Sequence, residues 1–157
     1  MKKYLLIIVL GLFAQLGRTQ IFEKITFQTS YCFGTCPVYR LELKADKSFK
    51  LHTEIVFLEN SQTRELDSAK MGYFIGKLDK KMYEKFIAAF QQSDICNLTF
   101  DGAKCCDGSL ISLTVNYDEI QKELVSMFPP KQADVLLDVL YEICQTSPMK
   151  RVNANYK

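Results

Sequence analysis

The sequence predicts an α+β domain, with a mostly antiparallel sheet of about six strands covered on one face by two helices. Two observations predict this class. Six short segments have the composition of strands, and most of them alternate apolar and polar residues as half-buried strands do. Two longer segments instead repeat their apolar residues with helical spacing. The predicted order is β-β-β-β-α-β-β-α, and strands joined by short turns pair antiparallel beneath the helices.

The first half of the chain supplies four of the predicted strands. Residues 21–29 (IFEKITFQT) and 38–45 (VYRLELKA) alternate apolar and polar side chains. The turn sequence ADKS then leads into residues 49–57 (FKLHTEIVF), so the second and third strands are expected to form a hairpin. After a polar stretch, residues 71–78 (MGYFIGKL) are the fourth predicted strand.

The second half supplies the two helices and a second hairpin. In residues 78–94 (LDKKMYEKFIAAFQQSD) the apolar period becomes helical, and Asp79 is well placed as the N-cap. Residues 109–117 (SLISLTVNY) and 121–128 (QKELVSMF) are predicted to pair as the hairpin. Residues 129–145 (PPKQADVLLDVLYEICQ) are the closing helix, which is entered through two prolines.

The N-terminus predicts export. Lys2 and Lys3 precede an apolar run, YLLIIVLGLFA, that is shorter than the roughly 20 residues needed to cross a bilayer but is typical of a signal peptide. Residues 1–20 contain no cysteine, so no lipid-modified N-terminus is expected. The predicted organisation is a signal peptide at 1–20, a single domain at 21–146 and a flexible C-terminal tail at 147–157. We therefore expect a secreted or periplasmic protein.

The charge balance of the exported part excludes one class of partner. The whole chain has 20 Lys and Arg against 18 Asp and Glu, and three of the basic residues lie in the predicted signal peptide. The remaining 17 basic and 18 acidic residues give a net charge near −1. Nucleic-acid binding needs a basic surface, so no nucleic-acid partner is expected. No later apolar run is long enough for a membrane span after signal cleavage.

The most distinctive segment is SYCFGTCPVYRLEL, in which Cys32 and Cys36 flank a short loop. An even number of cysteines, six, in an exported chain favours disulfides. Gly34 permits a sharp bend, which would bring the two Cα atoms close enough for a bridge. The prediction is a Cys32–Cys36 staple, and the alternative is that each cysteine bonds elsewhere.

The other cysteines lie in the second half of the chain. Cys96 and the neighbouring pair Cys105 and Cys106 bracket one loop, so a second bridge from Cys96 to one member of the pair is predicted. Cys144 falls on the apolar face of the last helix, where it is expected to be a buried thiol.

Two alternative functions would use the same cysteines. A redox dithiol normally lies at a helix N-terminus that lowers the thiol pKa, whereas Pro37 follows Cys36 and leads into a strand. A zinc site needs about four ligands, which Cys32, Cys36, Cys105 and Cys106 would have to supply. Neighbouring cysteines bind one ion poorly, so no metal site and no cofactor are predicted.

No catalytic residue is assigned. His52 is the one histidine in the chain, and it alternates with Lys50 and Glu54 on the polar side of a strand, where solvent exposure is expected. Asp101 and Asp107 share the cysteine-rich loop, but Asp-Gly pairs are mainly turn formers. The interpretation leans away from an enzyme.

Aromatic residues cluster around the predicted staple, and they are the candidate binding residues: Tyr31, Phe33 and Tyr39. Rings with polar tips make good recognition surfaces. The alternative for Tyr39, which lies within a predicted strand, is a place in the core or on the sheet face.

The segment CFGTCPVYRLEL, followed by DKSFKL, resembles the signature of a bacterial family common in Bacteroidota, domain of unknown function 6438. That signature is Cys-(Phe/Tyr)-Gly-Thr-Cys-Pro-x-Tyr, which residues 32–37 and Tyr39 match, and then two strands around a polar turn. Asp107 ahead of GSLISLTVNY is similar to a later part of the family pattern. The chain departs from the pattern at Lys47, where a turn glycine is common, and in the extra cysteines at 105–106. The resemblance implies a single exported domain and no established activity.

These observations predict an exported bacterial envelope domain that is stapled by disulfides. Its expected role is a non-enzymatic module that binds a protein or glycan partner. The alternative is a thiol-redox or metal-binding protein that uses the cysteine loops.

Overall fold

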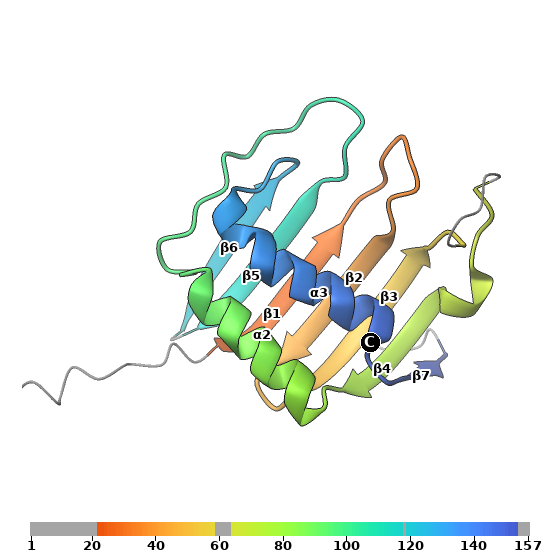
Figure 1. Ribbon diagram of the computed structural model, residues 1–157, viewed down its shortest axis with the longest axis horizontal. Helices are drawn as coiled ribbons and strands as arrows, with labels where there is room; N and C mark the ends of the chain where they lie inside the picture. The colour runs from red at the N-terminus through yellow and green to blue at the C-terminus, as the bar shows by residue number, and fades with distance from the viewer. Residues whose placement is uncertain (1–21, 59–63, 118, 154–157) are drawn as a thin grey trace, which may run out of the picture.

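The computed structural model describes residues 22–58, 64–117 and 119–153, and within them seven strands form one open antiparallel sheet (Figure 1). The strand order across the sheet is β6-β5-β1-β2-β3-β4-β7. The strands are β1 (Phe22–Thr29), β2 (Val38–Lys44), β3 (Ser48–Ile55), β4 (Gly72–Lys77), β5 (Ile111–Tyr117), β6 (Ile120–Ser126) and β7 (Met149–Val152). The predicted α+β class and antiparallel pairing are confirmed, with one strand more than expected.

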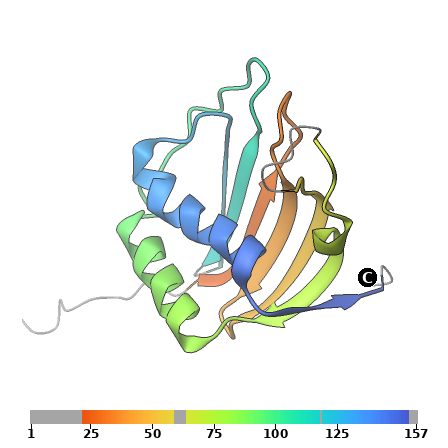
Figure 2. The ribbon, with the colours of Figure 1, turned by 45° about the vertical axis from the view of Figure 1, so that its right-hand side comes forward.

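Two helices cover the same face of the sheet (Figure 2). They are α2 (Lys80–Gln92) and α3 (Asp134–Thr146), and two short 3-10 turns, η1 (Ser68–Lys70) and η2 (Lys131–Ala133), lie in the connections. The hydrophobic core lies between the helices and the sheet. Its largest fully buried side chains come from both layers and the loop between α2 and β5: Phe22, Phe27, Phe86, Phe90, Ile25, Leu41, Leu43, Leu51, Ile95, Leu98, Leu113 and Leu136.

The alternation predicted from the sequence decides which face of each strand is buried. In β2, Leu41 and Leu43 are fully buried, whereas Arg40 between its apolar neighbours is exposed. Cross-strand pairing continues this separation, because Leu41 lies opposite Leu51 of β3 and Arg40 lies opposite His52. The face that the helices leave open is therefore largely polar, as expected for an antiparallel sheet with one solvated side.

Helix α2 begins where the sequence indicates. Asp79 has extended backbone geometry, and its Oδ1 atom accepts a 2.7 Å hydrogen bond from the Met82 amide. This contact satisfies one of the amides that a helix N-terminus leaves without an internal partner. The buried face of the helix then presents Phe86 and Phe90 to Phe22 of β1, at ring-centroid distances of 5.2 and 5.6 Å.

The turn between β2 and β3 contains Lys47, the position where the family that the sequence resembles often has a glycine. Lys47 adopts a left-handed backbone conformation with φ of 73°, which glycine adopts at no steric cost. The Lys47 amide donates to the Lys44 carbonyl at 3.0 Å and closes the turn. Its ammonium lies 4.9 Å from the centre of the Tyr83 ring, so the lysine adds a cation–π contact that glycine would lack.

The C-terminal tail is a correction to the sequence prediction. Residues 147–157 were expected to be flexible, yet Met149–Val152 form β7 at the edge of the sheet. Tyr73 of β4 pairs with Val152, and Gly76 pairs with Met149. Four residues are too few for a period-two pattern to be recognised, which is why the sequence did not indicate this strand.

The predicted signal peptide at 1–20 lies outside the described residues. Among the residues that the structure does describe, no helix is both long and apolar enough to cross a membrane.

Two tyrosines, Tyr39 of β2 and Tyr141 of α3, make the stability of the fold sensitive to alkaline pH. Burial raises the pKa of Tyr39 from 10.0 to about 12 and also raises the pKa of Tyr141. The folded state therefore retains these protons where the unfolded chain loses them. The stabilisation is fully present below pH 10 and is lost as pH rises from the unfolded pKa toward the folded one.

We expect the urea midpoint to fall between about pH 10 and about pH 12, and to fall less steeply in Tyr39→Phe. The measurement is urea unfolding followed by circular dichroism across this range. An identical slope in Tyr39→Phe would contradict the assignment of this pH dependence to Tyr39.

Candidate functional site

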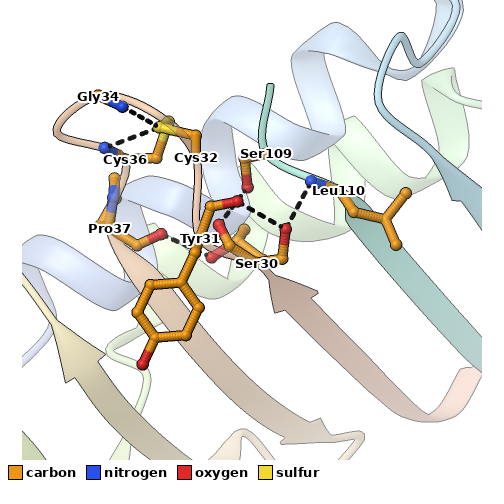
Figure 3. The surroundings of a disulfide bond; sticks show 9 residues. Ser30, Tyr31, Cys32, Gly34, Cys36, Pro37, Ser109 and Leu110 are labelled. Atoms are coloured by element: carbon orange, nitrogen blue, oxygen red, sulfur yellow. Dashed lines mark hydrogen bonds between the residues drawn. A yellow bond between two sulfur atoms is a disulfide. The ribbon is translucent and has the colours of Figure 1, made fainter. Parts of the chain in front are cut away.

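The candidate site is centred on the loop between β1 and β2, which a disulfide closes. Cys32 and Cys36 are bonded with an S–S distance of 2.04 Å and a Cα–Cα distance of 5.8 Å (Figure 3). The amides of Gly34 and Cys36 point at the Cys32 sulfur, at 3.2 and 3.3 Å. The predicted Cys32–Cys36 staple is thus present.

A buried threonine anchors the base of this loop. The Thr29 hydroxyl donates to the Pro37 carbonyl at 2.8 Å and accepts from the Tyr39 amide at 2.9 Å. It therefore ties the end of β1 to the start of β2 in a place where the usual ladder bonds give way to the loop.

Replacing Thr29 with valine keeps the shape of the side chain but leaves the Pro37 carbonyl and the Tyr39 amide without this partner. We expect a loss of about 1–3 kcal/mol in the free energy of unfolding, because buried polar groups without partners are costly. Denaturant unfolding measures it. Thr26→Val, in the same strand on the open face, is the matched control and should change stability by no more than about 0.5 kcal/mol. Equal losses in the two variants would contradict the anchoring role.

A second loop lies beside the stapled loop at the same end of the sheet (Figure 1). It runs from α2 to β5 and contains Cys105, Cys106 and Asp107. The Phe33 amide donates to the Asp107 carbonyl at 3.0 Å. Ser30 adds three further contacts to this second loop, with hydrogen bonds of 2.7–3.0 Å to Ser109 and Leu110. The stapled loop is therefore fixed to its neighbour as well as to the sheet.

Two of the three predicted binding residues lie on the surface. Tyr31 is 56% exposed and Phe33 is 77% exposed. The Tyr31 hydroxyl donates to the Glu54 carboxylate of β3, and this contact raises the pKa of Tyr31. Tyr39 is only 4% exposed and packs against the Tyr141 ring, with centroids 6.3 Å apart, so it lies in the core and not on the surface of the stapled loop.

The two loops enclose a shallow hollow of about 340 Å³. Its lining includes Tyr31, Cys32 and Phe33 of the stapled loop, Cys106 and Asp107 of the second loop, and Met127, which follows β6.

The other predicted disulfide is not formed. Cys32–Cys36 is the one disulfide within the described residues, so no bridge joins Cys96 to Cys105 or Cys106. Instead, the sulfurs of Cys105 and Cys106 lie 2.7 Å from each other. Two cysteines that flank a loop in the sequence need not come into contact in the fold. Here the contact is between the adjacent residues Cys105 and Cys106.

The remaining cysteine and the loop aspartates have structural surroundings. Cys144 is buried on α3 as expected, and burial raises the pKa of its thiol. Asp101 accepts hydrogen bonds from the Ser126 hydroxyl and the Ala103 amide, at 2.6 and 2.9 Å, which lower the pKa of its carboxyl. In the part of the chain that the structure describes, no group of three or more His, Cys, Asp or Glu residues is placed to hold a metal ion.

The open face of the sheet adds a feature that the sequence did not indicate. The His52 ring stacks on Tyr73 of β4 with centroids 4.1 Å apart and an angle of 8° between the planes. Both rings belong to one cross-strand row with Arg40 of β2. Only the register between β3 and β4 reveals this pair, because the two residues are far apart in the sequence.

Fold and site together define the class: a small α+β domain with an open-faced antiparallel sheet and a disulfide-closed loop at one end. The family model described as Domain of unknown function (DUF6438) matches residues 23–143, and the chain belongs to this family. The resemblance at CFGTCPVY is thereby confirmed. No curated protein matches the chain.

Proposed function

We propose that this domain is a non-enzymatic binding module of an exported protein, and that the stapled loop recognises a protein or glycan of the bacterial cell envelope. The observation that carries the proposal is the exposure of Phe33, together with Tyr31, on a loop that a disulfide and two sets of hydrogen bonds hold in place.

The exposed rings are the physical reason to expect recognition at this loop. A phenylalanine that is 77% exposed gains little burial energy from folding, but it would gain it on contact with a partner. Aromatic residues are enriched among those that dominate binding energy. A loop that is already fixed loses little conformational entropy on binding, which favours affinity.

The protein arm of the test is photo-cross-linking in the native host. A photoreactive phenylalanine analogue at position 33 is expected to give a discrete heavier species. The same analogue at position 120, an exposed apolar site in the hairpin at the opposite end of the sheet, is the control. Identical adducts at both positions would indicate non-specific collisions and would count against the proposal.

The glycan arm measures sedimentation of the purified chain with isolated cell-wall polysaccharide. Phe33→Ala and Tyr31→Ala are each expected to lower the association constant about tenfold, the effect of losing roughly 1.4 kcal/mol. Ile120→Ala should leave it unchanged. The proposal fails if neither arm shows an interaction that depends on Phe33.

The staple provides a separate prediction. Cys32→Ser with Cys36→Ser is expected to cost about 2 kcal/mol, because closing so short a loop removes little entropy from the unfolded chain. The fold should persist while the amides of residues 30–36 exchange faster with solvent, which hydrogen-exchange mass spectrometry measures. Complete unfolding of the double variant would make the staple a requirement of the fold, and the binding proposal would lose its main support.

A further inference from the structure

We propose that Cys105 and Cys106 form a dithiol that exchanges with the Cys32–Cys36 disulfide across the hollow between the two loops. This inference goes beyond the proposed binding function and does not depend on it.

The first support is the geometry of the neighbouring pair. The Cys105 and Cys106 sulfurs are 2.7 Å apart, compared with 2.04 Å in the disulfide of the same structure. Both side chains are exposed, so reagents and other thiols reach them. The left-handed backbone at Cys106, with φ of 61°, is uncommon for a residue other than glycine and shapes the turn in which the two sulfurs meet.

The second support is the proximity of this pair to the disulfide. The Ser30–Leu110 and Phe33–Asp107 hydrogen bonds, both at 3.0 Å, show that the two loops run antiparallel to each other. Cys32 and Cys106 are each one residue from the Phe33–Asp107 bond, on opposite sides of it. Cys32 and Cys106 also line the same hollow. Each pair therefore contributes one cysteine to the wall of this hollow, close to the hydrogen bond that joins the two loops.

The exchange needs no external oxidant. The Cys106 thiol gives its proton to solvent, and its thiolate attacks the Cys32 sulfur. A Cys32–Cys106 bond forms, and Cys36 leaves as a thiolate that takes up a proton. Cys105, after giving its proton to solvent, then attacks Cys106. This forms a Cys105–Cys106 disulfide and releases Cys32 as a thiolate, which takes up a proton from solvent. One disulfide and two thiols are present before and after, so electrons and protons balance.

Two local features agree with this order of steps. The amides of Gly34 and Cys36 point at the Cys32 sulfur, and amide donors favour a thiolate at that atom when it leaves. The neighbouring Cys106 thiol raises the pKa of Cys105, which disfavours Cys105 as the thiol that attacks first.

The decisive experiment traps the intermediate. Cys36→Ser with Cys105→Ser keeps Cys32 and Cys106, while Cys36→Ser with Cys106→Ser keeps Cys32 and Cys105 as the matched control. Both proteins are reduced, treated with about 0.1 mM oxidised glutathione, and mapped by non-reducing peptide mass spectrometry. Intramolecular attack competes at an effective concentration near the millimolar range, so the first variant is expected to show roughly tenfold more inter-loop bridge than glutathione adduct at Cys32.

The result that overturns the proposal is glutathione capping without an inter-loop bridge. Equal bridging in the control also overturns it, because the assignment of Cys106 as the attacking thiol would be wrong. Since a variant without the staple can lose its fold, the wild-type chain is tested as well. Oxidant-free incubation of the wild type followed by alkylation is expected to label Cys32 and Cys36 in a detectable fraction. Labelling that does not exceed that of Cys105→Ser with Cys106→Ser would also overturn the proposal.

Discussion

Phe86→Ala is expected to destabilise the domain by about 3–5 kcal/mol, a large part of the roughly 5–15 kcal/mol that holds a domain folded. Phe86 is 0% exposed, and its ring contacts Phe22 of β1 edge-to-face at 5.2 Å. It also lies 6.0 Å from the Phe90 ring and 6.4 Å from the Tyr83 ring. The substitution removes one of the two α2 rings that pack on Phe22 of β1 and leaves a cavity that the rigid sheet cannot fill.

The measurement is denaturant unfolding followed by circular dichroism, with Phe33→Ala as the matched control. Both variants lose the same ring, but Phe33 is largely exposed and its removal should cost no more than about 0.5 kcal/mol. A loss below about 1 kcal/mol in Phe86→Ala would mean that α2 does not pack on β1 as described.

The element order could be predicted because it depends on local patterns. The alternation in β2 and the apolar face of α2 each show which side chains are buried. Both patterns are visible within a short run of consecutive residues. The Asp79 cap is equally local, since the carboxylate contacts an amide three residues later. The fold class follows once enough of these elements are placed in order.

Contacts between distant segments could not be predicted in the same way. The hydrogen bond from Phe33 to Asp107 and the stacking of His52 on Tyr73 both depend on which strands become neighbours and in which register. The burial of Tyr39 has the same origin. Its side chain is covered because α3 crosses the sheet there and presents Tyr141.

The cysteines include one pairing that the sequence could predict and one that it could not. Cys32 and Cys36 are four residues apart around a glycine, so local geometry alone makes the bridge feasible. The pairing of Cys96 was an inference about loop closure, and the structure places Cys105 and Cys106 against each other instead. Sequence spacing therefore identified the staple but did not identify the exchange site beside it.

Gly76→Ala is the second substitution with a large expected effect, about 3 kcal/mol of destabilisation, because it overpacks the edge of the core. A Cβ atom at this position in β4 would lie 2.3 Å from the Phe49 ring and 2.6 Å from the Pro148 carbonyl oxygen. Phe49 is buried directly across from it on β3, and Pro148 leads into β7. Since one of the obstructing atoms is backbone, a change of rotamer at Phe49 does not relieve the strain, and β7 must move.

The predicted signature is therefore a lower free energy of unfolding together with faster hydrogen exchange at the amides of Met149–Val152, the strand that would be displaced. Gly108→Ala is the matched control, because its added Cβ would come no closer than 4.0 Å to a side-chain atom, and it should be neutral within about 0.5 kcal/mol. The double variant Phe49→Leu with Gly76→Ala should lose less free energy of unfolding than the two single variants lose together. The smaller leucine side chain leaves room for part of the added Cβ. Additive losses would show that the Phe49 ring does not close over Gly76. Unchanged protection of the β7 amides in Gly76→Ala would show that the entry to β7 does not close over it.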